Sequence, residues 1–253
     1  MAQRFNGKVV LVTGATSGIG KETVLALARE GAKVAFTGRR EEMGKALEKE
    51  ANAIAPGSAL FVRADHALEA DNKRAVDETV KRFGRLDGAV NNAAIEGRAG
   101  PIAETSADDY KQVFEINVLG VLMGMKHQVP AMLRSGGGSI VNITSGLGHV
   151  GMAHMHVYTG SKHAVEGITK SVALELAQKG IRVNTIAPGG VATEMNARAF
   201  VGDEAKKAFA AFHPVGRIAQ SAEIAAPILF LLSDESSFVT GTSLLVDGGI
   251  TAQ

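Results

Sequence analysis

Tyr158 and Lys162 stand four residues apart in the segment HVYTGSKHAV, and the residues that follow it are typical of a helix. At roughly 100° per residue the two side chains share one helix face, which Val165, Val172 and Leu176 continue. Such a face packs against the body of a protein, where a lysine is rarely buried without a partner. One interpretation is a lysine whose stem lies on apolar surface while its ammonium reaches solvent. The other is a proton-transfer site, because a neighbouring ammonium stabilises a phenolate and lowers the pKa of the phenol.

The elements that would position this pair follow from the rest of the chain. Short apolar segments alternate with helical patterns, and we expect strands at 8–13, 33–37, 59–64, 86–91, 138–144, 181–187 and 243–249. Strands that are apolar on both faces and alternate with helices are typical of a parallel sheet covered on both sides. No linker, repeat or low-complexity segment interrupts the pattern. Residues 1–253 are therefore predicted to form one α/β domain.

Parallel sheets of this kind bind ligands at the carboxyl ends of their strands. The first strand is followed by TGATSGIG, in which Gly14, Gly18 and Gly20 precede a helix. Glycines allow the backbone to turn sharply and approach a pyrophosphate, which the amino end of the helix then attracts. The spacing differs from G-x-G-x-x-G, and a plain tight turn is the alternative.

The second strand is followed by TGRR. Dinucleotide-binding folds that use NAD place an acidic residue here, whereas this chain has Gly38 followed by Arg39 and Arg40. The guanidinium groups favour a 2′-phosphate, and hence NADP(H) over NAD(H). The alternative is a solvated arginine pair at the start of a helix.

Polar or turn-forming residues follow the other inner strands as well. Asp65 follows the third strand and could accept a hydrogen bond from an adenine amino group. Asn91 ends the fourth, where it either ties neighbouring strand ends together or contacts the cofactor. Pro188 and Gly189 end the sixth. Together these strand ends predict a continuous crevice for a dinucleotide.

The same topology brings Tyr158 to this crevice. Ser145 follows the fifth strand, and Tyr158 begins the next helix, so the two residues are expected side by side. Lys162 then gains a partner, and it could also donate to the nicotinamide ribose.

In this order the motifs T-G-x3-G-x-G, N-N-A, an upstream serine, Y-x-x-x-K and P-G-x-x-x-T resemble the short-chain dehydrogenase/reductase family, essentially end to end. The resemblance implies a doubly wound Rossmann-type fold with a seven-stranded parallel sheet and helices on both faces. It also implies an NAD(P)-dependent oxidoreductase that transfers a hydride between a nicotinamide and a secondary alcohol or ketone.

The resemblance assigns roles to individual residues. Tyr158 would be the general acid/base, Ser145 would hold the substrate oxygen, Lys162 would tune Tyr158, and Asn117 would hold a water in a proton relay. The expected cofactor contacts are Thr13, Gly14, Ser17, Gly18, Ile19, Gly20, Gly38, Arg39, Arg40, Asp65, His66, Asn91, Ala93, Tyr158, Lys162, Pro188, Gly189, Val191 and Thr193.

Three positions depart from the family pattern. Thr144 stands where a serine often precedes the catalytic serine, and we expect this to change little. Ala94 stands in NNAA where N-N-A-G is commoner, and we expect it to strain or displace that turn. His66 stands where an apolar residue is usual, so the edge of the adenine pocket is expected to differ.

The substrate is expected between a loop at about 145–157 and a lid at about 190–215. His149, His154 and His156 lie in or beside this loop, but without cysteines or nearby carboxylates they do not make a metal site. Phe200, Phe209 and Phe212 in the lid suit either an apolar substrate or helix packing. A hydroxy lipid, an acyl-thioester ketone, a sugar and a small secondary alcohol remain possible substrates.

Net charge and the distribution of apolar residues limit the kinds of partner and the location that we expect. A formal net charge of +1 gives no basic field for nucleic acid or a membrane surface. The chain has no apolar run of about 18 residues and no signal-peptide pattern, so we expect a cytoplasmic protein. The family resemblance implies a homotetramer, with interfaces formed by helices near 106–130 and 157–178 and by the last helix and strand.

Two other functions are compatible with the scaffold. One is a non-redox enzyme, such as a dehalogenase or an epimerase-like lyase. The other is a dinucleotide-binding protein without turnover, which the presence of Ser145, Tyr158 and Lys162 disfavours.

Overall fold

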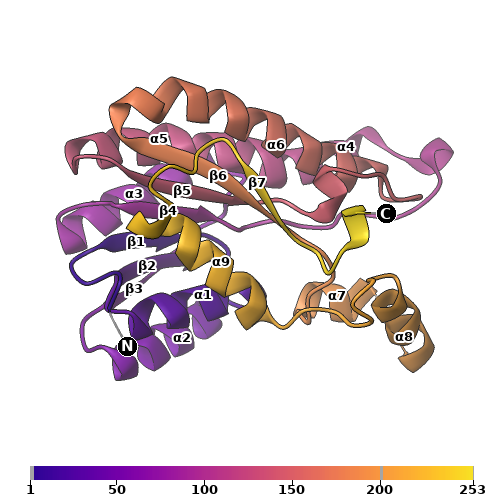
Figure 1. The fold of residues 1–253 in the computed structure, drawn as a ribbon, viewed down its shortest axis with the longest axis horizontal. Helices are drawn as coiled ribbons and strands as arrows, with labels where there is room; N and C mark the ends of the chain where they lie inside the picture. Colours follow the sequence, from indigo (N-terminus) through magenta and orange to yellow (C-terminus); the bar gives the residue numbers. More distant parts are fainter. Residues whose placement is uncertain (1–2, 200–201, 253) are drawn as a thin grey trace.

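The computed structural model describes residues 3–199 and 202–252, and one seven-stranded sheet runs through it (Figure 1). The strands are β1 (Val9–Val12), β2 (Lys33–Gly38), β3 (Ala59–Arg63), β4 (Gly88–Asn91), β5 (Gly138–Ile143), β6 (Ile181–Pro188) and β7 (Ser243–Val246). Their order is β3-β2-β1-β4-β5-β6-β7, and every neighbouring pair is parallel. The predicted α/β fold with a seven-stranded parallel sheet is confirmed.

Helices cover both faces of this sheet (Figure 1). One face carries α1 (Gly18–Arg29), α2 (Glu41–Ile54) and α9 (Ser221–Leu232). The other carries α3 (Glu69–Phe83), α4 (Ala107–Phe114), α5 (Gly120–Arg134) and α6 (His156–Leu176). The short helices α7 (Glu194–Ala199) and α8 (Asp203–Ala211) project beyond these layers (Figure 1).

The sheet divides the interior into two apolar cores. In β1, Val10 and Val12 face the core beneath α1 and α9, whereas Leu11 faces the core beneath α3, α5 and α6. In β2, Phe36 faces the core beneath α1 and α9, and Ala35 faces the core on the other side of the sheet. Successive side chains of a strand point to opposite faces, so a strand buried on both sides needs apolar residues throughout.

The segment that links β4 to β5 is interrupted where the sequence pattern suggested one long helix. A π-helical turn, Glu115–Leu119, separates α4 from α5. Such turns hold an extra residue and often occur at functional sites. Asn117 lies in this turn and is buried.

The strand order places a crevice at one edge of the sheet. The chain runs from β1 outward to β3 and then returns to β4, on the other side of β1. Connections that leave in opposite directions open a crevice at the carboxyl ends of β1 and β4. Over the residues that the structure describes, no helix is both long and apolar enough to cross a bilayer.

Candidate active site

A cleft of about 840 Å³ lies at the carboxyl ends of the strands. It is lined by Ser145, Tyr158 and Lys162 and by most of the predicted cofactor contacts, namely Gly14, Ser17, Gly18, Ile19, Gly38, Arg39, Arg40, Asp65, His66, Ala93, Pro188, Gly189, Val191 and Thr193. Thr13, Gly20, Asn91 and Asn117 are not among its lining residues and lie behind the wall.

The glycine-rich turn lets backbone approach backbone closely. Gly14 has φ +63°, and a Cβ there would lie 2.6 Å from the Cα of Ala93. Gly18 has φ +56°, and its Cβ would lie 3.0 Å from Cγ2 of Thr193. Both positions combine a left-handed backbone with a close neighbour, so only glycine fits without a shift. The turn thus provides the kind of cradle that a pyrophosphate requires, next to the amino end of α1.

Polar side chains behind the cleft join the ends of neighbouring strands. Thr13 Oγ1 accepts from the backbone N–H groups of Asn92 and Ala93, at 3.0 and 3.1 Å. Asn91 donates to Asn142 Oδ1 on β5 at 2.8 Å and accepts from Gln128 Nε2, also at 2.8 Å. The expected tie between strand ends is present, and Asn91 is one of its members.

Ala94 was expected to strain or displace its turn, and the backbone angle φ tests one form of that strain. Among the described residues, His154 is the non-glycine residue with a positive φ, at 68°. Ala94 therefore does not adopt the left-handed backbone that favours glycine. The expected displacement of the turn remains a prediction.

Ser145, Tyr158 and Lys162 meet at the base of the cleft. Ser145 is the second residue after β5, and its hydroxyl interacts with that of Tyr158 on the first turn of α6. Lys162 is only 3% exposed, so its ammonium does not reach solvent. Its Nζ donates to the carbonyl of Ile143 at 3.0 Å and lies 5.4 Å from the centre of the Tyr158 ring. The interpretation as a solvent-reaching lysine is wrong.

Burial dominates the ionisation of this pair. Tyr158 keeps partial access from the cleft, yet burial raises the pKa of its phenol to about 12, while the hydrogen bond with Ser145 acts to lower it and the Glu96 carboxylate raises it further. Burial also lowers the pKa of the Lys162 ammonium to about 8. The expected lowering of the Tyr158 pKa is therefore wrong for the chain by itself. Loss of hydration penalises the phenolate more than the nearby ammonium stabilises it.

Asn117 is held by backbone contacts. Its side chain accepts from the N–H of Ile95 and donates to the carbonyl of Ile95, both at 2.9 Å, and it donates to Ser161 Oγ at 3.1 Å. It joins the loop after β4 to α6, one residue before Lys162. Its expected part in a proton relay remains a prediction.

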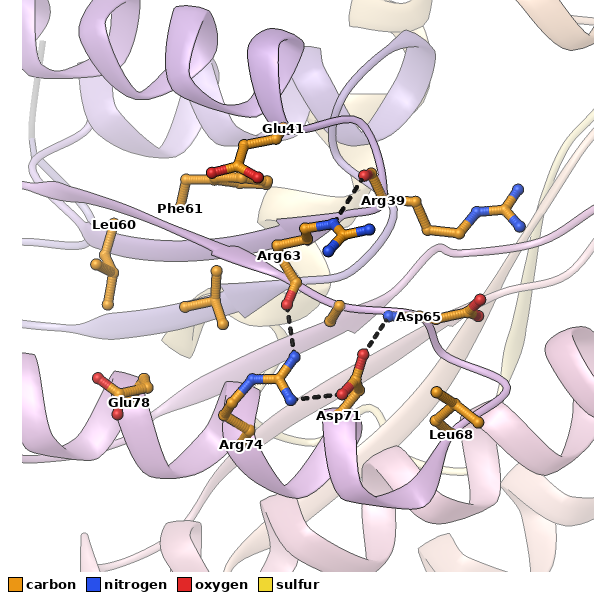
Figure 2. Close-up of a pocket in the computed structure, with 12 residues that line it drawn as sticks. Arg39, Glu41, Leu60, Phe61, Arg63, Asp65, Leu68, Asp71, Arg74 and Glu78 are labelled. Carbon is orange, nitrogen blue, oxygen red and sulfur yellow. Dashed lines mark hydrogen bonds and ion pairs between the residues drawn. The ribbon is translucent and has the colours of Figure 1, made fainter.

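The two arginines after β2 differ in their surroundings. Arg40 donates to Thr16 Oγ1 at 3.1 Å and to Ser17 Oγ at 2.8 Å, and it pairs with Glu194 of α7 at 2.7 Å. Over the described residues, the Arg39 guanidinium has no ion pair or hydrogen bond. In Figure 2 the Arg39 side chain points away from a neighbouring cluster formed by Arg63, Asp71 and Arg74. Arg39 is therefore the guanidinium that is available to a ligand.

Asp65 is held at the end of β3 by this neighbouring cluster (Figure 2). Asp71 accepts from the backbone N–H of Asp65 at 2.8 Å and pairs with Arg74, which donates to the Arg63 carbonyl at 2.8 Å. A groove of about 710 Å³ runs along this edge of the sheet and shares Arg39 and Asp65 with the main cleft.

His66 lies beside Asp65 but is packed inward. Its ring contacts Thr37 Oγ1 at 2.7 Å and Asn72 Oδ1 at 2.6 Å. Burial lowers the pKa of the imidazole. The departure from an apolar residue is thus accommodated by buried hydrogen bonds.

One side of the cleft is bounded by the two segments that we expect to enclose a substrate. Leu147, Met152 and Met155 come from the loop, and Phe209 comes from α8. Glu96 and Arg198 join the loop after β4 to α7 by an ion pair of 3.5 Å.

The other lid aromatics differ from Phe209. Phe212 is half exposed, and Phe200 lies outside the described residues.

The loop histidines are dispersed. His149 contacts Ser243 on β7, and His156 contacts Thr105 before α4. Within the described ranges, no group of three or more His, Asp or Glu side chains is placed to hold a metal ion.

Comparison with known proteins decides the family. A family model described as enoyl-(acyl carrier protein) reductase matches residues 14–251. A 2,5-dichloro-2,5-cyclohexadiene-1,4-diol dehydrogenase from Sphingobium indicum is 43% identical over 250 residues, or 98% of each chain. The chain belongs to the short-chain dehydrogenase/reductase family. The predicted membership in this enzyme family is confirmed.

Other members of the short-chain dehydrogenase/reductase family agree over the full length. A cyclohexanol dehydrogenase from an Acinetobacter species is 40% identical over 253 residues, covering 100% of this chain and 98% of its own. The crystal structure of levodione reductase superimposes with a TM-score of 0.95 at 36% identity, covering 98% of this chain and 99% of its own.

Two residues of this short-chain dehydrogenase/reductase site were missed by sequence reasoning. Glu166 is buried one helical turn after Lys162, and Thr16 receives the Arg40 guanidinium. The spacing Lys162–Glu166 places both side chains on one helix face, and this signal was present in the sequence. The position of Thr16 depends on the fold of the turn, and no spacing predicts it.

Proposed function

We propose that this chain is an NAD(P)-dependent oxidoreductase that transfers a hydride between a nicotinamide and a secondary alcohol or ketone. The single observation that carries the proposal is the meeting of Ser145, Tyr158 and buried Lys162 in a cleft that also contains the glycine-rich turn. The glycine-rich turn suits a dinucleotide, since Gly14 and Gly18 line the cleft where α1 begins and a helix amino end attracts a pyrophosphate.

The proposed mechanism assigns one task to each residue. A bound nicotinamide supplies or accepts the hydride. Tyr158 donates its proton to the carbonyl oxygen in reduction and takes the hydroxyl proton in oxidation. Ser145 donates to the same oxygen and stabilises the charge that develops there. Lys162 holds positive charge beneath the Tyr158 ring, and Asn117 holds the loop after β4 against α6.

The ionisation states favour reduction by the chain as it stands. A Tyr158 pKa of about 12 keeps the phenol protonated at neutral pH, which suits a proton donor. A Lys162 pKa of about 8 leaves the ammonium mostly charged there. Oxidation requires the phenolate, so it should gain most from the positive charge of an oxidised nicotinamide.

We infer that the substrate is an alicyclic secondary alcohol or ketone. Leu147, Met152, Met155 and Phe209 give the substrate side an apolar lining. Methionines adapt their shape to rings of different substitution. Two full-length relatives are named for six-membered ring alcohols, which supports the same class.

We also propose that NADP(H) is preferred over NAD(H). Gly38 leaves no carboxylate at the ribose position, and the Arg39 guanidinium, which has no partner among the described residues, suits a 2′-phosphate. Arg40 contributes less in this proposal, because its guanidinium already donates to Thr16 and Ser17 and pairs with Glu194.

The proposed assembly is a cytoplasmic homotetramer of single-domain subunits. Leu119 and Leu122 leave apolar surface near the start of α5, and Leu174 on α6 is 84% exposed. Phe238 and Leu245 do the same near β7. Exposed apolar side chains on these elements are what subunit interfaces would cover.

A substrate panel tests the function. Purified protein is given cyclohexanone, 2-hexanone or an acyl-thioester ketone, with NADPH or NADH, and the nicotinamide absorbance is followed. We expect turnover of the cyclic ketone, and we expect Tyr158→Phe to retain cofactor binding while kcat falls by about 10²- to 10⁴-fold.

Each other outcome has a distinct meaning. A fully active Tyr158→Phe variant refutes the acid/base assignment. Cofactor binding without turnover of any ketone or alcohol favours the dinucleotide-binding protein, and a chain that binds no dinucleotide favours the non-redox enzyme.

A further inference from the structure

Glu166 is a buried acidic residue to which the proposed mechanism gives no task. Glu166 lies on α6 one turn beyond Lys162, and it is 5% exposed. An ionised carboxylate is costly to bury unless hydrogen bonds replace its hydration. Its partners therefore indicate what this part of the fold requires.

Three hydroxyl groups from three strands of the sheet converge on Glu166. Thr144, directly after β5, donates to Oε1 at 2.6 Å, and Ser243 of β7 donates to the same oxygen at 3.0 Å. Thr185 of β6 lies 3.0 Å from Oε1 and 2.9 Å from Oε2. An ionised carboxylate only accepts hydrogen bonds, so it satisfies all three donors at once.

The substrate loop is attached to the same carboxylate. His149 Nε2 lies 2.8 Å from Ser243 Oγ and 3.3 Å from Glu166 Oε1. Because the single hydroxyl hydrogen of Ser243 goes to Glu166, the imidazole must donate to Ser243. At Gly148 a Cβ would lie 3.2 Å from Cγ of Glu166, so the loop rests directly on this side chain.

Glu166 also acts on Lys162 through its charge. Burial lowers the pKa of Lys162, and the Glu166 carboxylate opposes that effect. The ionisable groups that face this pair among the described residues are Tyr158 on α6 and His149 on the loop. The Glu166 carboxylate thus contacts the residue before Ser145 and the substrate loop, and its charge acts on Lys162.

We propose that Glu166 is a positioning residue that fixes Ser145 and the substrate loop relative to Tyr158. Its negative charge also favours the protonated form of Lys162. Glu166 acts on Ser145 through Thr144, and on the loop through Ser243 and His149. This role rests on the proposed reduction of a ketone by the same site.

The experiment compares Glu166→Gln with the wild-type holoenzyme in reduction of cyclohexanone by NADPH. We expect kcat to fall roughly 10- to 100-fold, because the amide has one accepting oxygen in place of two and directs an N–H donor at one of the hydroxyls that now donate to the carboxylate. The dissociation constant of NADPH should stay within about 2-fold, since Glu166 does not line the cleft.

The pH profile separates positioning from mere stability. Loss of the carboxylate lowers the Lys162 pKa further, so the ammonium is lost at lower pH. The alkaline fall of kcat in the direction of reduction should therefore move to lower pH in Glu166→Gln. Thr144→Val removes a hydroxyl without changing charge, and it should lower kcat while leaving the midpoint of that fall in place.

The matched control is Glu175→Gln, a change on the exposed part of the same helix, where Glu175 pairs with Lys179. It should leave kcat and the pH profile unchanged. If Glu166→Gln does not fold, Glu166→Asp decides, since it keeps the charge at shorter reach. It should keep the wild-type midpoint and lose part of kcat.

Three results would overturn the role of Glu166, two of them with Glu166→Gln. One is a folded Glu166→Gln variant with the wild-type kcat and midpoint, and the other is a variant that loses thermal stability alone. A Glu166→Asp variant with full kcat would do the same. If the wild-type protein reduces no ketone at all, the proposed function itself has failed, and that outcome is visible before any variant is made.

Discussion

The two ends of the cleft are built differently. At the Tyr158 end, Lys162 and Glu166 are buried and linked to strand ends by hydrogen bonds. At the Arg39 end, both arginines are exposed, and the ion pair between Arg40 and Glu194 is itself exposed to solvent. Charges act strongly where water is excluded and weakly where it screens them. From this comparison we expect reaction chemistry and cofactor choice to be separable in this molecule.

The largest effect should come from the buried end. Lys162→Met removes the ammonium beneath the Tyr158 ring and the donor to the Ile143 carbonyl. We expect kcat to fall by about 10²- to 10⁴-fold, measured by nicotinamide absorbance. Lys170→Met changes an exposed lysine on the same helix and should have no effect. A Lys162→Met variant within a few-fold of wild type would remove the contrast between the two ends.

An intermediate effect should come from Gly38→Asp, which places a carboxylate at the ribose. The ratio of kcat/KM for NADPH to that for NADH should move towards NADH by about 10- to 100-fold. Any Cβ at this position would lie 2.4 Å from Cγ2 of Thr16, and Thr16 also receives Arg40. The substitution should therefore weaken both cofactors as well.

Gly38→Ala is the control for that change, because it introduces the same Cβ without the charge. It should weaken both cofactors and leave their ratio near the wild-type value. Equal ratios in Gly38→Asp and Gly38→Ala would contradict the assignment of cofactor choice to this end of the cleft.

The smallest effect should distinguish the two arginines. Arg39→Ala should raise the dissociation constant of NADPH by about 3- to 10-fold at low salt and by less at high salt, while that of NADH stays unchanged. Arg40→Ala should weaken both cofactors alike, because Arg40 braces Thr16 and Ser17. Fluorescence titration of each cofactor measures both. Identical behaviour of the two variants would mean that their different surroundings do not matter.

Particular elements explain how far the sequence could lead. The alternation of Val10, Leu11 and Val12 requires apolar packing on both faces, so the parallel sheet was predictable. The same holds for the glycine turn, which follows β1, and for the shared helix face of Tyr158 and Lys162. These features are local, because they depend on strand and helix periodicity and on the conformational freedom of glycine.

Other features depend on residues far apart in the chain. Sequence periodicity did not reveal that Ser243, Thr185 and Thr144 meet at Glu166. Nor could it distinguish Arg39 from Arg40, since only the fold brings Thr16 and Glu194 to one of them.

The amino-acid sequence by itself determined the α/β architecture, the crevice at the strand ends and the identity of the groups that meet there. The tertiary structure alone decided their ionisation, because burial raises the Tyr158 pKa and lowers that of Lys162. Hydration is lost only when distant segments close around a side chain, so no local pattern of residues reports it.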